Sequence, residues 1–211
     1  GDLEFALYIA NGRVSSAAAE VDFTDIALGN DDIFDISGRL EVDVSYNDWL
    51  VAANHLVLSL QDHEWPEATL RVEASIDKDG EIVMLDTRAS YLNLDDLQVL
   101  APWLNDEQKN TLVEFEPSGV IRNLVATVSD IESEQPRFNV PAELDRVGIA
   151  AAKSRPGMRG FSGLLRANRA GGRLEIKSTD LEVAIPEYLP EDQKYYLSTY
   201  RVCPVQFHLR Q

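Results

Sequence analysis

Hydrophobic and polar residues alternate along most of this chain. Residues 38–46, 68–76 and 172–178 read GRLEVDVSY, ATLRVEASI and GRLEIKS, and residues 3–9 follow the same period of two. Successive side chains of a β-strand point to opposite faces of the sheet. This pattern therefore predicts strands whose sheet has one apolar face and one polar face that meets water.

Turn-forming residues separate these runs. They include Asn11-Gly12, Asn47-Asp48, Asp77–Gly80, Pro117–Gly119 and Ala170–Gly172. Such dipeptides favour tight turns, and the short spacing between runs predicts that neighbouring strands pair as antiparallel hairpins. The fold class predicted from these observations is mainly β, with mostly antiparallel strands.

One interval, residues 93–116, has helical spacing instead. Its leucines recur three or four positions apart, at Leu94, Leu97, Leu100 and Leu104. Asn93 and Asn105 each precede acidic residues and can cap a helix start, and Pro102 ends or kinks the first segment. The spacing predicts two short amphipathic helices within about 94–116 that cover an open part of the sheet.

Charge and composition exclude some classes of function. The net charge of −17 argues against nucleic acid as a partner, because phosphate binding needs positive faces. The single cysteine excludes an internal disulfide framework, and no apolar run reaches the length of a membrane span. The chain opens without Met inside a strand-like run, which we interpret as a segment of a larger protein.

The glycine-rich stretch 155–178 is the one basic region and spaces Gly157, Gly160 and Gly163 three apart. A dinucleotide loop would need G-x-G-x-x-G between a strand and a helix. Two strand-like pieces around a glycine turn follow here instead, so we interpret the stretch as a β-hairpin.

No catalytic or metal-binding motif is present. The histidines His55, His63 and His208 lack the spacing of a zinc site, and no G-x-S-x-G element occurs. We therefore expect no enzymatic activity, no metal site and no cofactor. Two interpretations of the alternating strands remain: the packed core of a β-sandwich, or an open curved sheet whose apolar face holds an apolar ligand.

Four stretches resemble the central region of the YhdP-type, AsmA-like proteins of Gram-negative envelopes. They are SYNDWLVAANHLVLSLQDHEWPEATLRV (45–72), ASYLNLDDLQVLAPWL (89–104), EPSGVIRNLVATV (116–128) and the stretch 155–178. Each motif is loose, but their order is fairly specific, and the resemblance covers roughly residues 1–186. The segment 187–211 departs from the pattern, so we expect a β-rich groove segment over 1–186, with the helical insertion at about 93–116, and a C-terminal tail of uncertain origin.

This resemblance implies a non-catalytic periplasmic segment of a protein tethered to the inner membrane. The family implies a serial sheet folded lengthwise into an apolar groove that moves phospholipid between the inner and outer membranes. Its partners would be phospholipid, or another apolar ligand, and neighbouring repeats of the same protein. The expected lipid-binding side chains, which line the groove, are Phe5, Leu7, Leu40, Val42, Val44, Leu56, Leu58, Leu70, Val72, Val83, Leu85, Leu124, Val128, Leu174 and Ile176.

Two other functions stay open at this point. A carbohydrate- or protein-binding β-sandwich predicts exposed aromatic residues such as Trp49, Trp65 or Tyr91, and a structural envelope scaffold predicts no ligand. The arginines of the basic stretch, which we expect on a polar sheet face, also offer a contact for a lipid phosphate at the rim of a groove. They are Arg155, Arg159, Arg166 and Arg169.

Overall fold

The structure is a computed structural model in which the chain divides into two compact units. Unit 1 comprises Gly1–Tyr91 and Asn123–Val140, and unit 2 comprises Leu92–Arg122 and Pro141–Gln211. The residues described are 1–28, 32–45, 47–60, 63–97, 104–131, 133, 135–152, 155–184, 195–197 and 203–207.

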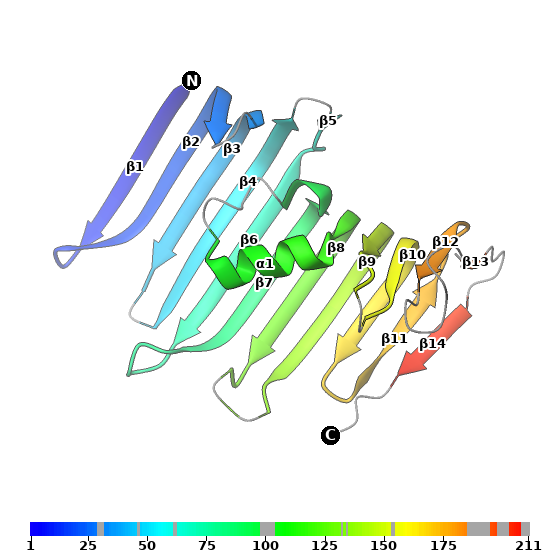
Figure 1. Cartoon of the computed structure of the whole chain (residues 1–211). Coiled ribbons are helices and arrows are strands. Elements are labelled where there is room, and N and C mark those ends of the chain that lie inside the picture. Colours follow the sequence, from blue (N-terminus) through cyan, green and yellow to red (C-terminus); the bar gives the residue numbers. More distant parts are fainter. Residues whose placement is uncertain are drawn as a thin grey trace. The chain divides into compact units, whose positions relative to one another are not determined.

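Strands dominate both units, as the alternation predicts (Figure 1). They are paired in the order β1-β2-β3-β4-β6-β7-β8-β9-β10-β11-β14, with β5, β12 and β13 off this path. The sheet is open and the registers described are antiparallel, so the predicted fold class is confirmed and the alternative of two closed, packed sheets is not observed among the described residues. The strands are β1 (Asp2–Ala10), β2 (Arg13–Leu28), β3 (Asp32–Val44), β4 (Asp48–Leu60), β5 (His63–Glu64), β6 (Ala68–Ile76), β7 (Ile82–Asn93), β8 (Ser118–Ser129), β9 (Arg137–Ile149), β10 (Gly157–Asn168), β11 (Gly171–Ile176), β12 (Leu181–Ala184), β13 (Tyr195–Leu197) and β14 (Cys203–Phe207).

The first hairpin of unit 1 shows why the turn residues matter. Asn11 and Gly12 join β1 to β2 with φ angles of 53° and 73°. Two consecutive left-handed residues form the turn whose twist matches that of the flanking strands, and Asn-Gly is the pair that adopts it most readily. The predicted hairpin is therefore confirmed at this position.

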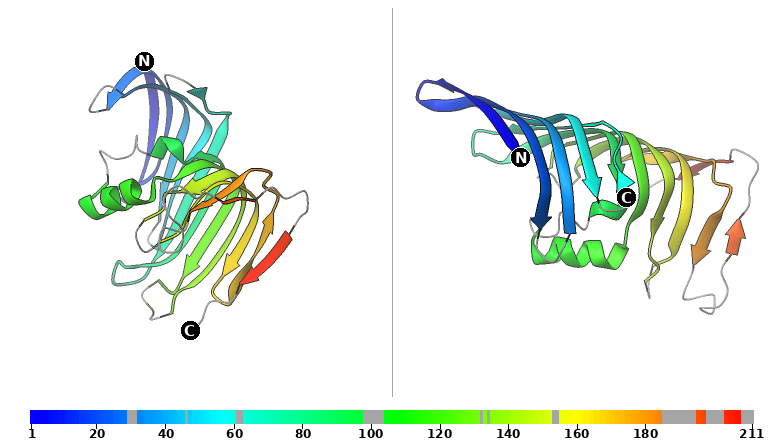
Figure 2. Two further views of the ribbon diagram at one scale, coloured as in Figure 1. Left: turned by 45° about the vertical axis from the view of Figure 1, so that its right-hand side comes forward. Right: turned by 90° about the horizontal axis from the view of Figure 1, so that it is seen from above.

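Among the register shifts that interrupt the strands of unit 1, two contain a left-handed non-glycine residue. The register shifts between Phe23 and Ile26 in β2 and between Ala53 and Leu56 in β4, and the left-handed residues Asp25 and His55 lie in these intervals. A bulge inserts an extra residue, bends its strand and increases the local twist. Figure 2 shows the strands of this unit bending along their length.

The glycine-rich stretch in unit 2 forms the β10–β11 hairpin, as predicted. Leu165 pairs with Leu174 and Asn168 with Gly171. The glycine spacing follows from close backbone contact: a Cβ on Gly163 would overlap the Glu175 carbonyl oxygen. These glycines admit a neighbouring backbone and do not cradle a phosphate.

Two helices were predicted within 94–116, and the prediction is wrong for the first of them. The described part of the chain has one α-helix, α1 (Asp106–Phe115), and Asp95–Leu97 form a short 3₁₀ turn. Asn93 holds that turn, because its Oδ1 accepts from the Asp95 N–H (3.3 Å) and its amide donates to Asp96 (2.8 Å). Local side-chain bonds of this kind compete with a continuing helix. Pro102 lies outside the described residues.

The capping prediction at Asn105 is confirmed. The Asn105 side chain accepts from the backbone N–H of Gln108 (2.9 Å), and the Gln108 side chain accepts from the Asn105 backbone (3.1 Å). This reciprocal capping box fixes the start of α1. Across the described residues, no helix is both long and apolar enough to cross a membrane.

In the segment that departs from the expected pattern, the residues described beyond 186 form two short strands. Strand β13 pairs with β12, and β14 pairs with β11 in an antiparallel register. The domain boundary at residue 186 stays a prediction.

Candidate functional site: the apolar face of unit 1

The strand registers gather large apolar side chains on one side of unit 1. Leu7 pairs with Ala17, Ala17 with Val42, Val42 with Val51, and Val51 with Val72, so one row crosses five strands. Residues directly opposite each other in paired strands share a face. We call this side the apolar face: Leu3, Phe5, Leu7, Ala17, Ala19, Val21, Phe23, Ile26, Phe34, Ile36, Leu40, Val42, Val44, Trp49, Val51, Ala53, Leu56, Leu58, Leu60, Ala68, Leu70, Val72, Ala74, Leu85, Thr87 and Ala89.

Many side chains of the apolar face remain accessible. Phe5 is 70% exposed, and Leu40 and Leu70 are 36% and 40% exposed. The buried positions are mostly small, such as Ala68 and Ala74, which their larger neighbours cover. Contiguous exposed apolar surface is rare on monomeric proteins and marks a binding surface.

The opposite face of unit 1 carries charges in pairs. Arg39 bonds Glu41, Arg71 bonds Glu73, and Arg88 bonds Asp86. Partners two residues apart in one strand point to the same side. We call this side the polar face; its ion pairs are mostly exposed, so each adds little stability but keeps the face hydrated.

Asp86 is the most enclosed carboxylate of the polar-face ion pairs, with a side chain 13% exposed. Its burial favours the protonated form, but hydrogen bonds from Thr127 (2.9 Å) and Arg88 (2.9 Å) and the charges of Arg88 and Arg71 together lower its pKa. The bond to Thr127 joins β7 to β8 on the polar face. Because side chains alternate, Leu124 and Val128 of β8 then point to the apolar side.

The structure places most predicted groove residues on this one face. By register they are Phe5, Leu7, Leu40, Val42, Val44, Leu56, Leu58, Leu70, Val72 and Leu85, and Leu124 and Val128 join them by alternation. Val83 lies at a register shift between β6 and β7. Leu174 and Ile176 belong to unit 2, where they pair with Leu165 and Gly163. A lipid-binding role for these residues stays a prediction.

The sequence alone missed several members of the apolar face. Phe34 and Ile36 precede the clear alternation of β3, and Trp49 was named only as an aromatic residue that the alternative β-sandwich function would expose. The register places Trp49 between Val44 and Ala74. The sequence does contain a signal for these residues, because each lies two positions from another apolar residue of the same strand.

Of the three aromatic residues that a carbohydrate-binding function would expose, Trp65 is buried, and Trp49 and Tyr91 are only partly exposed. Trp65 is buried and packs edge-on against Tyr91, with ring centroids 5.3 Å apart. Such an edge-on pair leaves little of the Trp65 ring surface for a sugar.

The four arginines of the basic stretch do not share one environment. Arg159 and Arg166 are exposed on β10, and Arg169 lies in the β10–β11 turn. Arg155 instead precedes β10 and packs against the end of α1, where it bonds Glu114. The expectation that all four line a polar sheet face is therefore wrong for Arg155.

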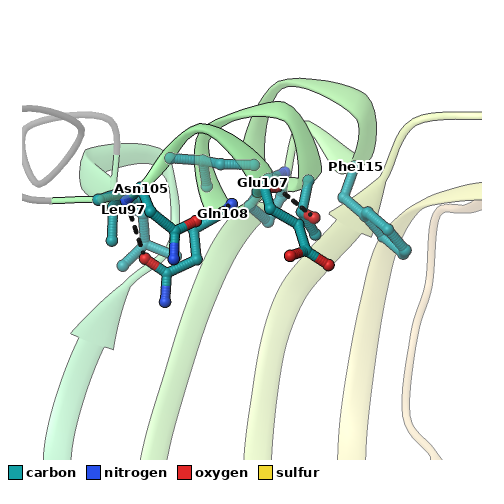
Figure 3. Close-up of a pocket in the computed structure, with 9 residues that line it drawn as sticks. Leu97, Asn105, Glu107, Gln108 and Phe115 are labelled. Atoms are coloured by element: carbon teal, nitrogen blue, oxygen red, sulfur yellow. Dashed lines mark hydrogen bonds between the residues drawn. The ribbon is translucent and has the colours of Figure 1, made fainter.

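A separate cavity of about 620 Å³ lies beside α1 in unit 2 (Figure 3). Its apolar lining is supplied by Leu97, Leu104, Leu112, Phe115 and Pro117. Asn105, Glu107, Gln108 and Thr111 complete its lining. Within the described residues, no group of three or more His, Cys, Asp or Glu side chains is placed to hold a metal ion.

Comparison with known proteins identifies one family. The sequence model of the family described as YhdP protein matches residues 1–202. No curated protein and no solved structure matches the chain.

Proposed function

The chain belongs to the YhdP protein family, and on this premise we propose that it is a periplasmic segment of a membrane-anchored protein that carries phospholipid between the inner and outer membranes. The lipid tails lie along the apolar face of unit 1. The headgroups remain toward water, so the segment acts as a path and not as a closed binding pocket.

The observation that carries this proposal is the continuity of the apolar face across β1, β2, β3, β4, β6 and β7. An acyl chain gains about 0.8 kcal/mol for each methylene removed from water. Among the side chains that the structure describes, this face carries no charge over six strands. It therefore offers that gain at every step along it, which a transport path requires.

The proposal assigns no catalytic role to the chain, because moving a phospholipid between membranes breaks no covalent bond. It also assigns neighbouring repeats of the same protein as partners. Strand β1 supports this assignment, since it lies at the end of the strand order and all nine of its residues are exposed. An unpaired strand edge is a template for pairing with a further strand.

Val42→Asp tests the proposed path. Val42 lies in the middle of the apolar face, between Ala17 and Val51. On an accessible face the new carboxylate stays hydrated, so the variant should fold but lose most of the phospholipid that the wild type retains in native mass spectrometry. Glu41→Gln on the polar face is the matched control and should retain lipid.

Two results would count against the proposal. A wild-type protein free of lipid, under conditions in which a known transfer protein keeps its lipid, would exclude lipid carriage by this segment. Failure of Val42→Asp to fold would show that the position is a closed core, because an unpaired buried charge is costly.

A further inference from the structure

Helix α1 has little to hold it in place along its length. It has 10 residues, and none of them is buried. Isolated helices shorter than about 12–15 residues are marginal in water, even with favourable sequences. The capping box at Asn105 stabilises only its first turn, so the order of α1 depends on contacts made elsewhere.

Those contacts gather at the C-terminal end of α1, and Arg155 makes most of them. Its Nη2 donates to the backbone oxygens of Glu114 (2.9 Å) and Ala150 (3.3 Å), and its Nη1 lies 3.3 Å from the Glu114 carboxylate. The guanidinium carbon lies 3.6 Å from the centre of the Phe115 ring. The backbone N–H of Ala150 also donates to the Phe115 oxygen (2.8 Å).

Arginine suits this position for two physical reasons. The last carbonyls of a helix lack partners within the helix, and the C-terminal end of the helix dipole favours a positive charge. The last turn of α1 contains no basic residue of its own, so Arg155, which lies 41 positions beyond Glu114, supplies the charge. A planar guanidinium can also bond two oxygens while it stacks on an aromatic ring, which an ammonium group cannot do.

We propose that Arg155 is a latch that keeps α1 ordered and thereby forms the cavity beside it. Leu112 and Phe115 contribute α1's apolar part of the cavity lining, and they hold that position only while the helix is formed. Disengaging Arg155 converts α1 to a disordered segment and removes this wall. Arg155 is thus a positioning residue, and α1 is an order–disorder element with the left-handed Glu116 at its end.

Hydrogen exchange of the whole chain tests the latch through Arg155→Gln. The amides of α1 and of Ala150 should exchange at least about tenfold faster in the variant, the factor expected when a hydrogen bond from a charged group is lost. The amides of the β10–β11 hairpin should exchange at the wild-type rate, because their ladder does not involve the Arg155 side chain.

Three further variants separate the latch from ordinary stabilisation. Arg155→Lys should restore only part of the protection, and Glu114→Gln should have a smaller effect than Arg155→Gln because both backbone acceptors remain. Arg166→Gln, which removes an exposed arginine from β10, should leave α1 unchanged. Unchanged α1 exchange in Arg155→Gln, or an equal acceleration in α1 and in the hairpin, would overturn the proposal.

Discussion

Two residues with left-handed backbone decide which side chains share the apolar face. Asp25 (φ 55°) and His55 (φ 52°) lie in bulges of β2 and β4. Before each bulge the odd-numbered residues of the strand lie on the apolar face, and after it the even-numbered residues do. In β4 the odd residue Ala53 and the even residue Leu56 therefore lie on one side. The sequence predicts each alternating run but not the bulge that joins two runs, because no local motif specifies the extra residue.

Asp86 gives a prediction about acid stability. Its pKa is lowered below its ordinary value of 3.8 by Thr127, Arg88 and Arg71 acting together against burial. A lowered pKa in the folded state contributes stability above about pH 4, and that contribution is lost as the pH falls through the folded value.

Asp86→Asn should therefore lower the free energy of unfolding of unit 1 at pH 7 by about 1–3 kcal/mol. The difference from wild type should shrink as the pH falls below about 4, where Asp86 of the unfolded chain becomes protonated before Asp86 of the folded protein does. Urea denaturation at pH 7 and pH 3 measures both effects. An equal difference at the two pH values would contradict the role given to this carboxylate.

The β10–β11 hairpin was predicted from the sequence, but which of its glycines can be replaced was not. Its glycines are not equivalent to turn glycines, because a Cβ on Gly163 meets the neighbouring backbone, whereas one on Gly12 would meet nothing within 4 Å. The sequence shows where glycine occurs, and only the structure separates close backbone approach from a left-handed turn.

Gly163→Ala should thus destabilise more than Gly12→Ala. The first forces apart two strand backbones, for which we expect about 3 kcal/mol or more. The second places alanine at φ 73°, which costs roughly 1–2 kcal/mol without a steric clash. Urea denaturation of the two variants compares these costs, and equal losses would show that Gly163 is not closely packed.

The start of helix α1 could be predicted from its local sequence. The cap at Asn105 was predicted from a few residues, since the side chain and the N–H that it binds lie within one turn. The first predicted helix failed because bonds to Asn93, and from the Gly119 N–H to Asp95, hold residues 95–97 as a turn. The Asn93 bonds are local, but the bond from Gly119 depends on β8, 24 positions along the chain from Asp95.

Asn105→Ala should weaken α1 by about 1 kcal/mol, because the side-chain acceptor for the Gln108 N–H is lost. Asn105→Ser is the control, since its hydroxyl can accept the same bond. Hydrogen exchange of the α1 amides should accelerate in the first variant and change little in the second. Similar exchange in both would show that the cap contributes nothing.

For the whole molecule, the sequence predicted the open, mainly antiparallel sheet and the family. Period-two alternation specifies that one side of each strand is apolar, so Leu40 and Leu70 could be named in advance. It does not specify which sides of different strands coincide, because that depends on register. Leu174 and Ile176 show the limit: they have the same pattern as Leu40 and Val42 but belong to the other unit.

Photocrosslinking at two adjacent positions of β6 tests whether phospholipid lies along the apolar face of unit 1. Leu70 lies on the apolar face, and Arg71 lies on the polar face beside Glu73. A photoreactive residue placed at each position in turn, in cells with labelled phospholipid, samples the two faces at nearly the same point of the sheet. Lipid adducts should form at position 70, and few or none should form at position 71. Equal labelling at both positions, or none at position 70, would contradict the proposed path.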